Sequence, residues 1–487
     1  MEPKKSIILV TVDCLRADHT GFMGYQRRTT PFLDSLAVES FVFPAAIAAG
    51  APTYYSLPSI LASRYPLALG RDVLGIAPQE TTITTVLRKA GYATAAFTAG
   101  NPYLSPQFGY DQGFDQFRDF CADQSLPSNP HKNVEPQRLS TGLNQKLKEV
   151  ASRWGPLEMI YDELYFRYCQ KRSPVPDSLN GLRPYPSADV IVDHACRWLG
   201  GLKGEPFFLW LHLMDPHWPY YPPDEAIEWM SGTQLSNYDK RYLNSFWNRS
   251  DLGQSRLAKR RHEVIALYDA GIRWADKQIS RLVAELKNSG QWKDCIFALT
   301  ADHGEEFLEH GQRFHSPGVS EELLHVPLLL RAPGSEEGQP GKSPFSLLNL
   351  APTLLDAAGV ACPVEFHGRS RWKAIRRREE SDEIAIAECV VGCTNPLRPE
   401  NRLGSRVLAV RDSRFKLVLH FDPAKEQLFD LDADPGERTE LDTSAHSSER
   451  KRLLQVARDH LLHSSSRVDQ AGRVRARLHE HLKRQSA

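Results

Sequence analysis

The chain has 487 residues, more than one hydrophobic core usually supports, so we expect one large domain and a smaller one. Lysine and arginine together number 60, as do aspartate and glutamate. This balance gives no whole-chain attraction to nucleic acid or to a membrane surface, and we expect neither as a partner. An apolar content of 41% is that of an ordinary globular protein.

The N-terminal residues predict neither a leader peptide nor a membrane span. The apolar run that begins at Ser6 ends at Asp13, which is too early for a span, and no small-residue cleavage site follows. The eight cysteines are scattered without paired spacing, which fits reduced thiols better than a disulfide framework. We therefore expect a cytoplasmic protein without a transmembrane segment.

Strand and helix alternate over the first hundred residues. Ser6 to Val12 is a continuous apolar, β-branched run, typical of a buried parallel strand. Helices are expected at 30–39, 53–63 and 81–89, and a strand at 92–98. This alternation predicts a parallel α/β sheet with right-handed crossovers.

Residues 102–186 break that alternation with Pro, Asn, Ser, basic and aromatic residues, and carry one helical stretch at 143–154. We interpret the segment as an insertion or lid over one end of the sheet. Regular elements return after it. They are a helix at 190–199, a strand at 206–213, a long amphipathic helix at 256–287, strands at 294–300 and 326–330, and a helix at 346–358.

The pattern changes to short strands with tight turns near residue 383, which predicts a small antiparallel sheet. Its strands are expected at 383–387, 407–410, 416–420 and 427–430. We predict a catalytic domain over 1–375, an antiparallel subdomain over 376–445 and a helical basic tail over 446–487. The tail would be a solvated helix packed on the core or, alternatively, a contact within a homo-oligomer or a segment that binds an anionic surface.

Two acidic motifs follow predicted strands. Asp13 comes directly after the first strand, and Asp302-His303-Gly304 follows the strand at 294–300. Ligands gather at the carboxyl ends of parallel strands, where carboxylate and imidazole groups can hold a divalent cation. Gly304 would let the backbone turn. The alternatives are an Asp13 that caps a turn and an ordinary surface loop after the later strand.

Several histidines and one asparagine are candidates for contact with the substrate. His310 and His315 follow in the loop after His303, and His212 and His217 flank a proline-rich loop after the strand at 206–213. These histidines would bind the transferred group or protonate a leaving group. Asn101, after the strand at 92–98, would bind an anion or simply form a turn.

Thr53 stands where a turn enters a predicted helix. The amides and dipole of a helix N-terminus favour an anion. A hydroxyl beside a divalent metal becomes a better nucleophile. The alternative is that Thr53 is a plain helix cap.

These motifs, in this order, resemble the sulfatase family of the alkaline phosphatase superfamily. The similar blocks are Asp13 to Asp18, 45–66, Met214 to Tyr220, 300–327, His367-Gly368-Arg369-Ser370 and 426–441. The resemblance implies a large, mostly parallel sheet flanked by helices, with a smaller C-terminal antiparallel sheet. It also implies a metal-dependent hydrolase of phosphate or sulfate esters, acting on a small-molecule, glycan or lipid ester.

The nucleophile segment departs from the family pattern. Sulfatases carry Cys or Ser in a Cys/Ser-x-Pro-Ser-Arg motif that is oxidised to formylglycine. Here Thr53 occupies that position, and Tyr55 and Leu57 replace the Pro and the Arg. Threonine cannot give formylglycine, and superfamily relatives with Thr there are phosphodiesterases, nucleotide pyrophosphatases or head-group transferases. We therefore favour phosphoester chemistry. Sulfate ester hydrolysis without formylglycine and a degenerate binding protein are the alternatives.

The metal ligands depart from the pattern too. Cys14 replaces a second acidic ligand, and His303 replaces the Asn of calcium-type sulfatases. The remaining set resembles single-metal relatives that use zinc or manganese, which nitrogen and oxygen donors favour over calcium. That set is Asp13, Thr53, Asp302 and His303.

The resemblance gives the other side chains their expected roles. Thr53 would attack, and His217, His310 or His315 would protonate the leaving oxygen. The lysine that often contacts the anion is missing, and His315 is its nearest substitute. A full second metal set is not evident, although Asp215, His217 and His310 could supply one.

Overall fold

The computed structural model describes residues 4–71, 73–121, 155–172, 182–231, 235–334, 338, 341, 343–379 and 381–462. The predicted helix at 143–154 and the end of the predicted tail lie outside these residues. None of the helices in the described part of the chain combines the length and apolar composition that crossing a bilayer requires.

One large sheet organises the molecule, and its strands run in the order β2-β11-β7-β1-β6-β4-β5 within the described residues. The five strands from β7 to β5 are parallel. The four inner ones, β7, β1, β6 and β4, are almost fully buried, because apolar side chains face helices on both sides. The bounds are β1 Ser6–Val12, β2 Phe41–Val42, β4 Ala93–Thr98, β5 Gln116–Arg118, β6 Phe207–Leu213, β7 Cys295–Ala301 and β11 Leu328–Arg331.

The edges of this sheet differ from the sequence prediction. β5 pairs with β4, so the predicted insertion at 102–186 begins with an edge strand of the main sheet. Pro327 divides the single strand expected at 326–330 into β10 (His325–Val326) and β11, because proline cannot donate a ladder hydrogen bond. β11 also runs antiparallel to β7, not parallel to it.

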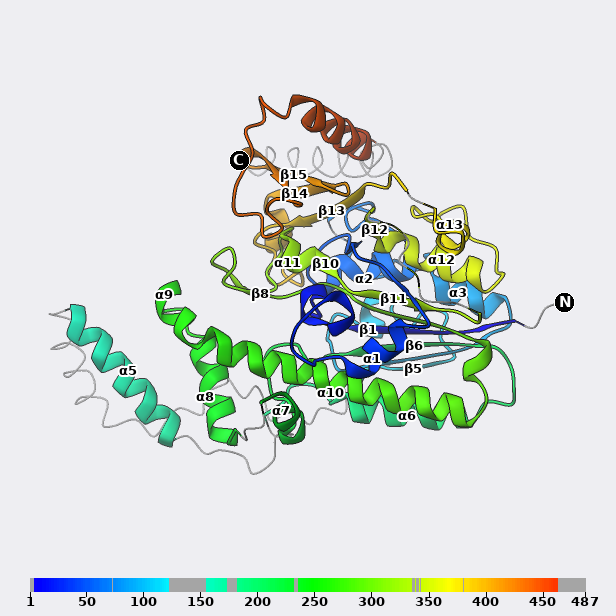
Figure 1. Cartoon of the computed structure of the whole chain (residues 1–487), viewed down its shortest axis with the longest axis horizontal. Helices are drawn as coiled ribbons and strands as arrows, with labels where there is room; N and C mark the ends of the chain where they lie inside the picture. The colour runs from blue at the N-terminus through cyan, green and yellow to red at the C-terminus, as the bar shows by residue number, and fades with distance from the viewer. Residues whose placement is uncertain are drawn as a thin grey trace, which may run out of the picture.

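Helices cover both faces of the sheet (Figure 1). α10 crosses one face together with α1 and α6, and α12 packs with α2 and α3 on the other. The bounds of the helices are α1 Pro31–Ala37, α2 Thr53–Ala62, α3 Ile83–Lys89, α5 Gly155–Arg172, α6 Ala188–Gly200, α7 Asp224–Ser231, α8 Asn237–Trp247, α9 Gln254–Leu257, α10 Arg261–Asn288, α11 Glu321–Leu324, α12 Leu350–Ala357 and α13 Trp372–Arg377. This arrangement confirms the predicted α/β class.

The bounds of three helices differ from the sequence prediction. α3 starts two residues later than expected because Thr82 and Thr85 form a capping box. The helix expected at 256–287 is α9, a short 3-10 turn at Ala258–Arg260, and α10. α5 lies in the segment at 102–186, where no helix was predicted at those residues.

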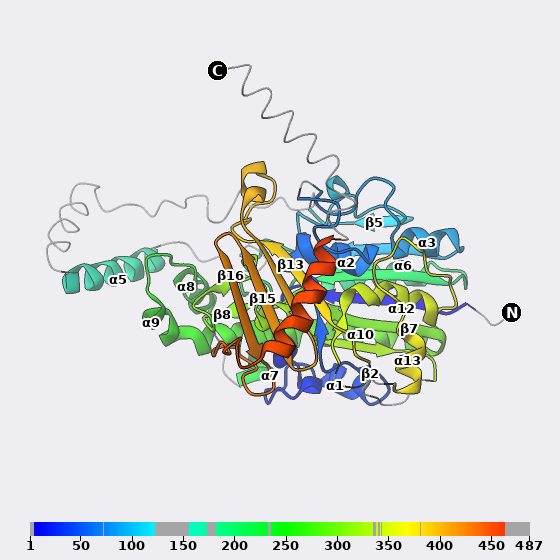
Figure 2. The same ribbon diagram turned by 90° about the horizontal axis from the view of Figure 1, so that it is seen from above.

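Four antiparallel strands form a second sheet in the order β13-β14-β15-β16, as the C-terminal pattern predicts. They are β13 Ala385–Val390, β14 Arg406–Arg411, β15 Phe415–Phe421 and β16 Ala424–Asp430. A helix at 447–462 lies across this sheet (Figure 2). Leu453 and Ala457 pack into the apolar cluster around Leu408 and Leu417, so the described part of the tail is a packed helix.

A buried ion cluster joins the second sheet to the main domain. Lys416 on β15 is fully buried, and its Nζ lies 3.1 Å from Glu321 on α11 and 2.8 Å from Glu437. Arg411 on β14 adds a second contact to Glu321, 3.2 Å away. Burial raises the pKa of Glu321, but Lys416 and Arg411 outweigh it and lower that pKa to about 2.

Lys416→Met is expected to destabilise the protein by about 3–5 kcal/mol, because it leaves two buried carboxylates without their shared cation. Lys425→Met is the matched control. It removes an exposed partner of Glu440, 3.6 Å away, and should cost less than about 1 kcal/mol. Urea unfolding measures the free energy of unfolding of both variants. An equal loss of stability in the two would show that the buried cluster does not stabilise the contact between the second sheet and the main domain.

Candidate active site

The register of the central strands brings several polar residues to one edge of the sheet. Val12 pairs with both Leu213 and Ala301, so β1, β6 and β7 end at the same level. Asp13 and Asp302 therefore leave the sheet side by side, as the rule for parallel strand ends predicts.

Thr53 is the first residue of α2, a helix whose ten residues are all buried. Its Oγ1 lies 3.2 Å from His303 Nε2 and 3.5 Å from Asp13 Oδ2. Asn101 Nδ2 donates to Asp13 Oδ2 over 3.1 Å and lies 3.5 Å from Thr53 Oγ1. The hydroxyl thus stands among a carboxylate, an imidazole and an amide at a helix N-terminus.

The donor set fits a divalent cation. Asp13, Asp302 and His303 are fully buried, and His303 Nε2 lies 3.6 Å from Asp13 Oδ1 and 3.5 Å from Asp302 Oδ2. Asp302 Oδ2 accepts no hydrogen bond from the described residues. A buried carboxylate oxygen in that state is costly unless a cation or a proton meets it.

Charge around the two aspartates is uneven. Burial raises the pKa of Asp13, but His217, His212 and His303 outweigh it and hold that pKa well below its ordinary value. Burial and the neighbouring charge of Asp13 raise the pKa of Asp302. Asp13 is therefore the carboxylate that keeps its negative charge. Asp302 needs further positive charge nearby before it is ionised as readily.

The backbone fixes the orientation of His303. Its Nδ1 lies 2.9 Å from the Gly304 carbonyl, which can only accept, so Nδ1 carries the proton and Nε2 presents a lone pair to Thr53. A Cβ on Gly304 would lie 1.9 Å from the Glu322 carbonyl oxygen. Close packing, not a left-handed backbone, therefore explains the glycine predicted at this turn.

His212 lies behind Asp13. It is fully buried on β6, with Nε2 3.2 Å from Asp13 Oδ2 and Nδ1 2.8 Å from Thr11 Oγ1. Trp210 Nε1 donates to the same Thr11 oxygen over 3.0 Å. This position differs from the predicted substrate contact, because His212 contacts Asp13 from the core and can orient it. Its donor atom also comes within 4.8 Å of those of Asp13 and Asp302.

A cavity of about 340 Å³ opens above Thr53. Its wall includes three of the predicted side chains, Asn101, His217 and His315, and the rings of Tyr54, Tyr103 and Phe314. The rings of His217 and His315 are 4.8 Å apart between centroids. The cavity therefore joins the predicted nucleophile to two of the three histidines proposed for the leaving group.

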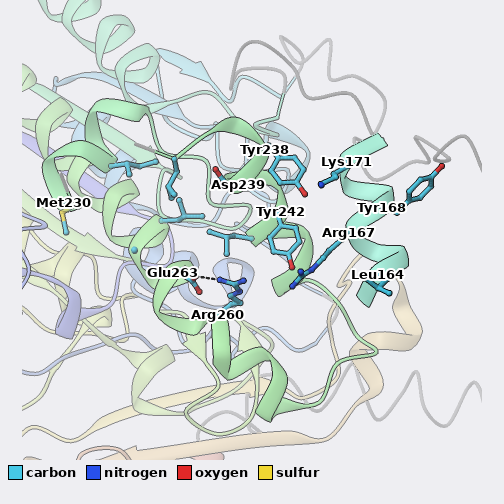
Figure 3. A pocket seen from close by; sticks show the side chains of 15 residues that line it. Leu164, Arg167, Tyr168, Lys171, Met230, Tyr238, Asp239, Tyr242, Arg260 and Glu263 are labelled. Atoms are coloured by element: carbon cyan, nitrogen blue, oxygen red, sulfur yellow. Dashed lines mark hydrogen bonds and ion pairs between the residues drawn. The ribbon is translucent and has the colours of Figure 1, made fainter. Parts of the chain in front are cut away.

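A larger cavity, of about 810 Å³, lies between α5 and the helices α8 and α10 (Figure 3). Its wall is mostly apolar, with Arg167, Lys171 and Arg260 among its polar side chains. It shares no lining residue with the cavity at Thr53. The strand-end cavity is thus the one that carries the predicted chemistry.

Two predicted residues lie elsewhere. His310 is exposed near the tip of the hairpin formed by β8 (Glu306–Phe307) and β9 (Arg313–Phe314), and its Nε2 lies 3.0 Å from Glu322. Asp215 accepts hydrogen bonds from Ser187 Oγ and from the Ala188 amide at the start of α6. The structure does not bring either to His217, so the second metal set suggested by the sequence does not form.

The structure places two further residues at the site, Cys14, to which the sequence analysis gave no role beyond replacing an acidic ligand, and Glu305, which it did not single out. Cys14 Sγ donates to Asp13 Oδ1 over 3.0 Å and lies 3.3 Å from His315 Nδ1. Glu305 is fully buried, with Oε2 3.2 Å from the same His315 nitrogen. Both residues lie close in sequence to predicted metal ligands, Cys14 to Asp13 and Glu305 to Asp302, and this closeness could have indicated that they belong to the site.

The comparisons with known proteins agree with this geometry. A family model described as Sulfatase matches residues 5–360, and one described as N-sulphoglucosamine sulphohydrolase, C-terminal, matches residues 309–461. The chain therefore belongs to the sulfatase family, which consists of ester-hydrolysing enzymes. Family membership confirms the resemblance and the enzyme class that the sequence motifs predicted.

Similar proteins carry different names. Arylsulfatase K of Gallus gallus is 23% identical over 464 residues, which cover 90% of this chain and 79% of that protein. The multifunctional alkaline phosphatase superfamily protein PehA of Trinickia caryophylli is 23% identical over 483 residues, covering 90% and 91%. The crystal structure of the phosphonate monoester hydrolase of Agrobacterium radiobacter has a TM-score of 0.66 at 19% identity, covering 95% and 96%.

Asp302→Asn is expected to weaken Mn²⁺ binding by more than the roughly 10–100-fold that loss of an outer-shell partner costs. The reason is that Asp302 holds a buried, unpartnered oxygen at the site. Electron paramagnetic resonance of free Mn²⁺ in a titration measures the affinity.

Asp215→Asn is the matched control, since Asp215 is also buried at a strand end but caps a helix. It should keep the Mn²⁺ affinity within about threefold and lower only the stability, as loss of a cap does. Equal loss of Mn²⁺ affinity in both variants would remove Asp302 from the metal site.

Proposed function

We propose that this enzyme hydrolyses phosphorus esters, with the Thr53 hydroxyl as the nucleophile. The observation that carries the proposal is the position of Thr53 Oγ1, within 3.5 Å of Asp13, Asn101 and His303 at the cavity. An ester bound in that cavity would contact the Thr53 hydroxyl directly. The volume of about 340 Å³ lies near the lower end of the range for small-ligand sites.

The residues around Thr53 prepare its oxygen for attack. The helix dipole of α2 favours negative charge at its first residue, and the Thr53 hydroxyl can donate its proton to Asp13 Oδ2, 3.5 Å away. The lone pair of His303 Nε2 is then left for a metal ion. A divalent ion held by Asp13, Asp302 and His303, zinc or manganese by its donors, would supply Lewis-acid stabilisation of charge when bound. Asn101 fixes Asp13 through its amide and can donate to an anion in the cavity.

The leaving oxygen would face the other histidines in the cavity wall. Burial lowers the pKa of His217 to about 4. Burial also acts to lower the pKa of His315, but Glu305 and Asp13 outweigh it and raise that pKa to about 9. We assign to this pair the neutralisation of the leaving oxygen, on the basis of their shared place in the cavity wall.

Phosphorus is favoured over sulfur by the nucleophile itself. The Cβ of threonine carries a methyl group, so Thr53 cannot become the aldehyde that family members use against sulfate esters. Leu57 stands where the family motif has an arginine, and it is fully buried in the core. Position 57 therefore supplies no cation beside the Thr53 hydroxyl.

Sulfate ester hydrolysis is the second candidate. It is favoured by the name arylsulfatase that several relatives carry, among them the Gallus gallus protein. Under this alternative the threonine oxygen, or a water molecule in the same cavity, would attack sulfur at the same site.

Thr53→Ala is expected to lower kcat by roughly 10³-fold or more, the scale on which loss of a nucleophile is felt. The control is Ser59→Ala, which removes another buried hydroxyl of α2, one that donates to the Ser56 carbonyl. That variant should keep kcat within about tenfold. Turnover of an aryl phosphodiester measures both, and full turnover by Thr53→Ala would remove Thr53 as the nucleophile.

The substrate class is tested with four aryl esters that share one leaving group: a phosphate monoester, a phosphodiester, a phosphonate monoester and a sulfate. We expect the largest kcat/KM on one of the three phosphorus esters, by at least about tenfold over the sulfate. A larger kcat/KM on the sulfate, abolished by Thr53→Ala, would establish the second candidate instead.

A further inference from the structure

A second cavity lies among four helices, separate from the catalytic cavity. Its volume is about 810 Å³, and its floor is formed by Ile227 and Met230 of α7, Leu243 of α8 and Ala266 and Leu267 of α10. This volume falls in the range of sites that hold small organic ligands, which are mostly apolar and carry a few placed polar groups. The cavity therefore has the size and the lining of a ligand site.

One face of α5 forms the outer wall of this cavity. The residues Leu164, Arg167, Tyr168 and Lys171 line it at intervals of three and four, so they share one side of the helix. Leu164 is 61% exposed, and it lines the same space as the apolar floor. A hydrophobic ligand between Leu164 and the floor would remove apolar surface on both sides from water, which favours its binding.

Polar contacts hold α5 over the cavity from a neighbouring face of the helix. Glu163 lies 3.0 Å from Arg167 on the same helix. It also lies 3.3 Å from Arg249, which follows α8, and 3.2 Å from Arg256 of α9. Tyr242 of α8 donates its hydroxyl to the same carboxylate over 3.3 Å. These contacts fix the position of the wall without filling the space beneath it.

The charged side chains of the wall leave one cation without a partner. Asp239 caps the start of α8, and Glu263 lies 2.5 Å from Arg260. Both acidic side chains among the described lining residues are therefore engaged by other groups. Lys171 lies on the same wall and forms no ion pair within the described part of the chain. An anion in the cavity would meet this ammonium group.

The polarity of the wall changes along the cavity. Figure 3 shows Met230 at one end, and Arg167 and Lys171 of α5 at the other. Tyr238 and Tyr242 of α8 lie between these ends, with their ring centroids 6.3 Å apart. A ligand that matches this order has an apolar body and a negative charge at one end.

We propose that this cavity binds one molecule of a single-chain amphiphile with a singly charged anionic head group, of which a fatty acid is the simplest. The chain lies on the floor formed by α7 and α10, and the head group faces Lys171. A free molecule fits better than a bilayer, because Ile227 and Leu267 are buried between helices and cannot reach a membrane surface. The proposal goes beyond the proposed function and does not depend on it, since the two cavities share no lining residue.

The test is isothermal titration calorimetry of the full chain with octanoate, decanoate and dodecanoate, each below the concentration at which it forms micelles. We expect one ligand per chain and a Kd that falls roughly tenfold for each two methylene groups added, because the added groups leave water. Decanol, which lacks the charge, should bind about three- to fivefold more weakly than decanoate.

Lys171→Met removes the charge and keeps a side chain of similar length. It should weaken decanoate binding about three- to fivefold and leave the Kd of decanol within about twofold. Lys259→Met is the matched control, because Lys259 is also exposed and precedes Arg260 but does not line the cavity. Its Kd for decanoate should stay within about twofold of the wild-type value.

Ala266→Trp fills the floor of the cavity and should abolish binding of both decanoate and decanol. Circular dichroism monitors its fold, and Lys171→Met decides the proposal if Ala266→Trp does not fold. The proposal would be overturned by a Kd that does not depend on chain length, or by decanoate binding that either folded variant leaves unchanged. Binding to phosphatidylglycerol vesicles without binding of decanoate would also overturn it, because the basic face of α5 would then contact a membrane.

Discussion

Two carboxylates buried at one edge of the sheet set the central constraint of this structure. Donor oxygens of Asp13 and Asp302 lie within 4.8 Å of each other, and both residues are fully buried. Two negative charges at that distance repel by about 3–4 kcal/mol at an effective dielectric constant near 20. His212 Nε2, 3.2 Å from Asp13 Oδ2, can offset part of this cost, and a cation or a proton on Asp302 would offset the rest. A cation at this edge would therefore stabilise the fold as well as supply the proposed chemistry.

The surrounding strands and helices position the residues at that edge of the sheet. The central parallel strands deliver Asp13 and Asp302 at the same level, and α2 brings Thr53 to them from a distant part of the chain. Burial of the whole of α2 leaves its first residue little freedom to move. The rigid sheet and helix thus place the proposed nucleophile, the candidate metal ligands and the cavity together, so that substrate binding needs little further ordering of these groups.

Much of the fold could be predicted from the sequence, because buried strands and capped helices leave local patterns. The strand end at Asp13 and the Asp302-His303 motif followed from apolar runs that stop at polar residues. The edge strand β5 did not, since three partly exposed residues carry no such pattern. The division at Pro327 could have been anticipated from the missing amide of proline.

The residues around Thr53 could be predicted from the sequence, whereas the residues in the wall of the cavity could not all be. Residue type alone did not separate His310 from His315, five residues apart. The β8–β9 hairpin leaves His310 exposed and returns His315 to the cavity. The contact between Cys14 and His315 joins residues 301 apart and depends on a left-handed backbone at Cys14, which no local pattern reveals. Such contacts follow from the register of the sheet, which cannot be deduced from local sequence patterns.

The most direct test of this account is a crystal structure of the metal-loaded enzyme, measured on both sides of the absorption edge of the metal. The account predicts an anomalous peak about 2.0–2.2 Å from donor atoms of Asp13, Asp302 and His303, with Thr53 Oγ1 beside it. A fully loaded crystal without a peak between these residues would contradict it, whatever activity the enzyme shows.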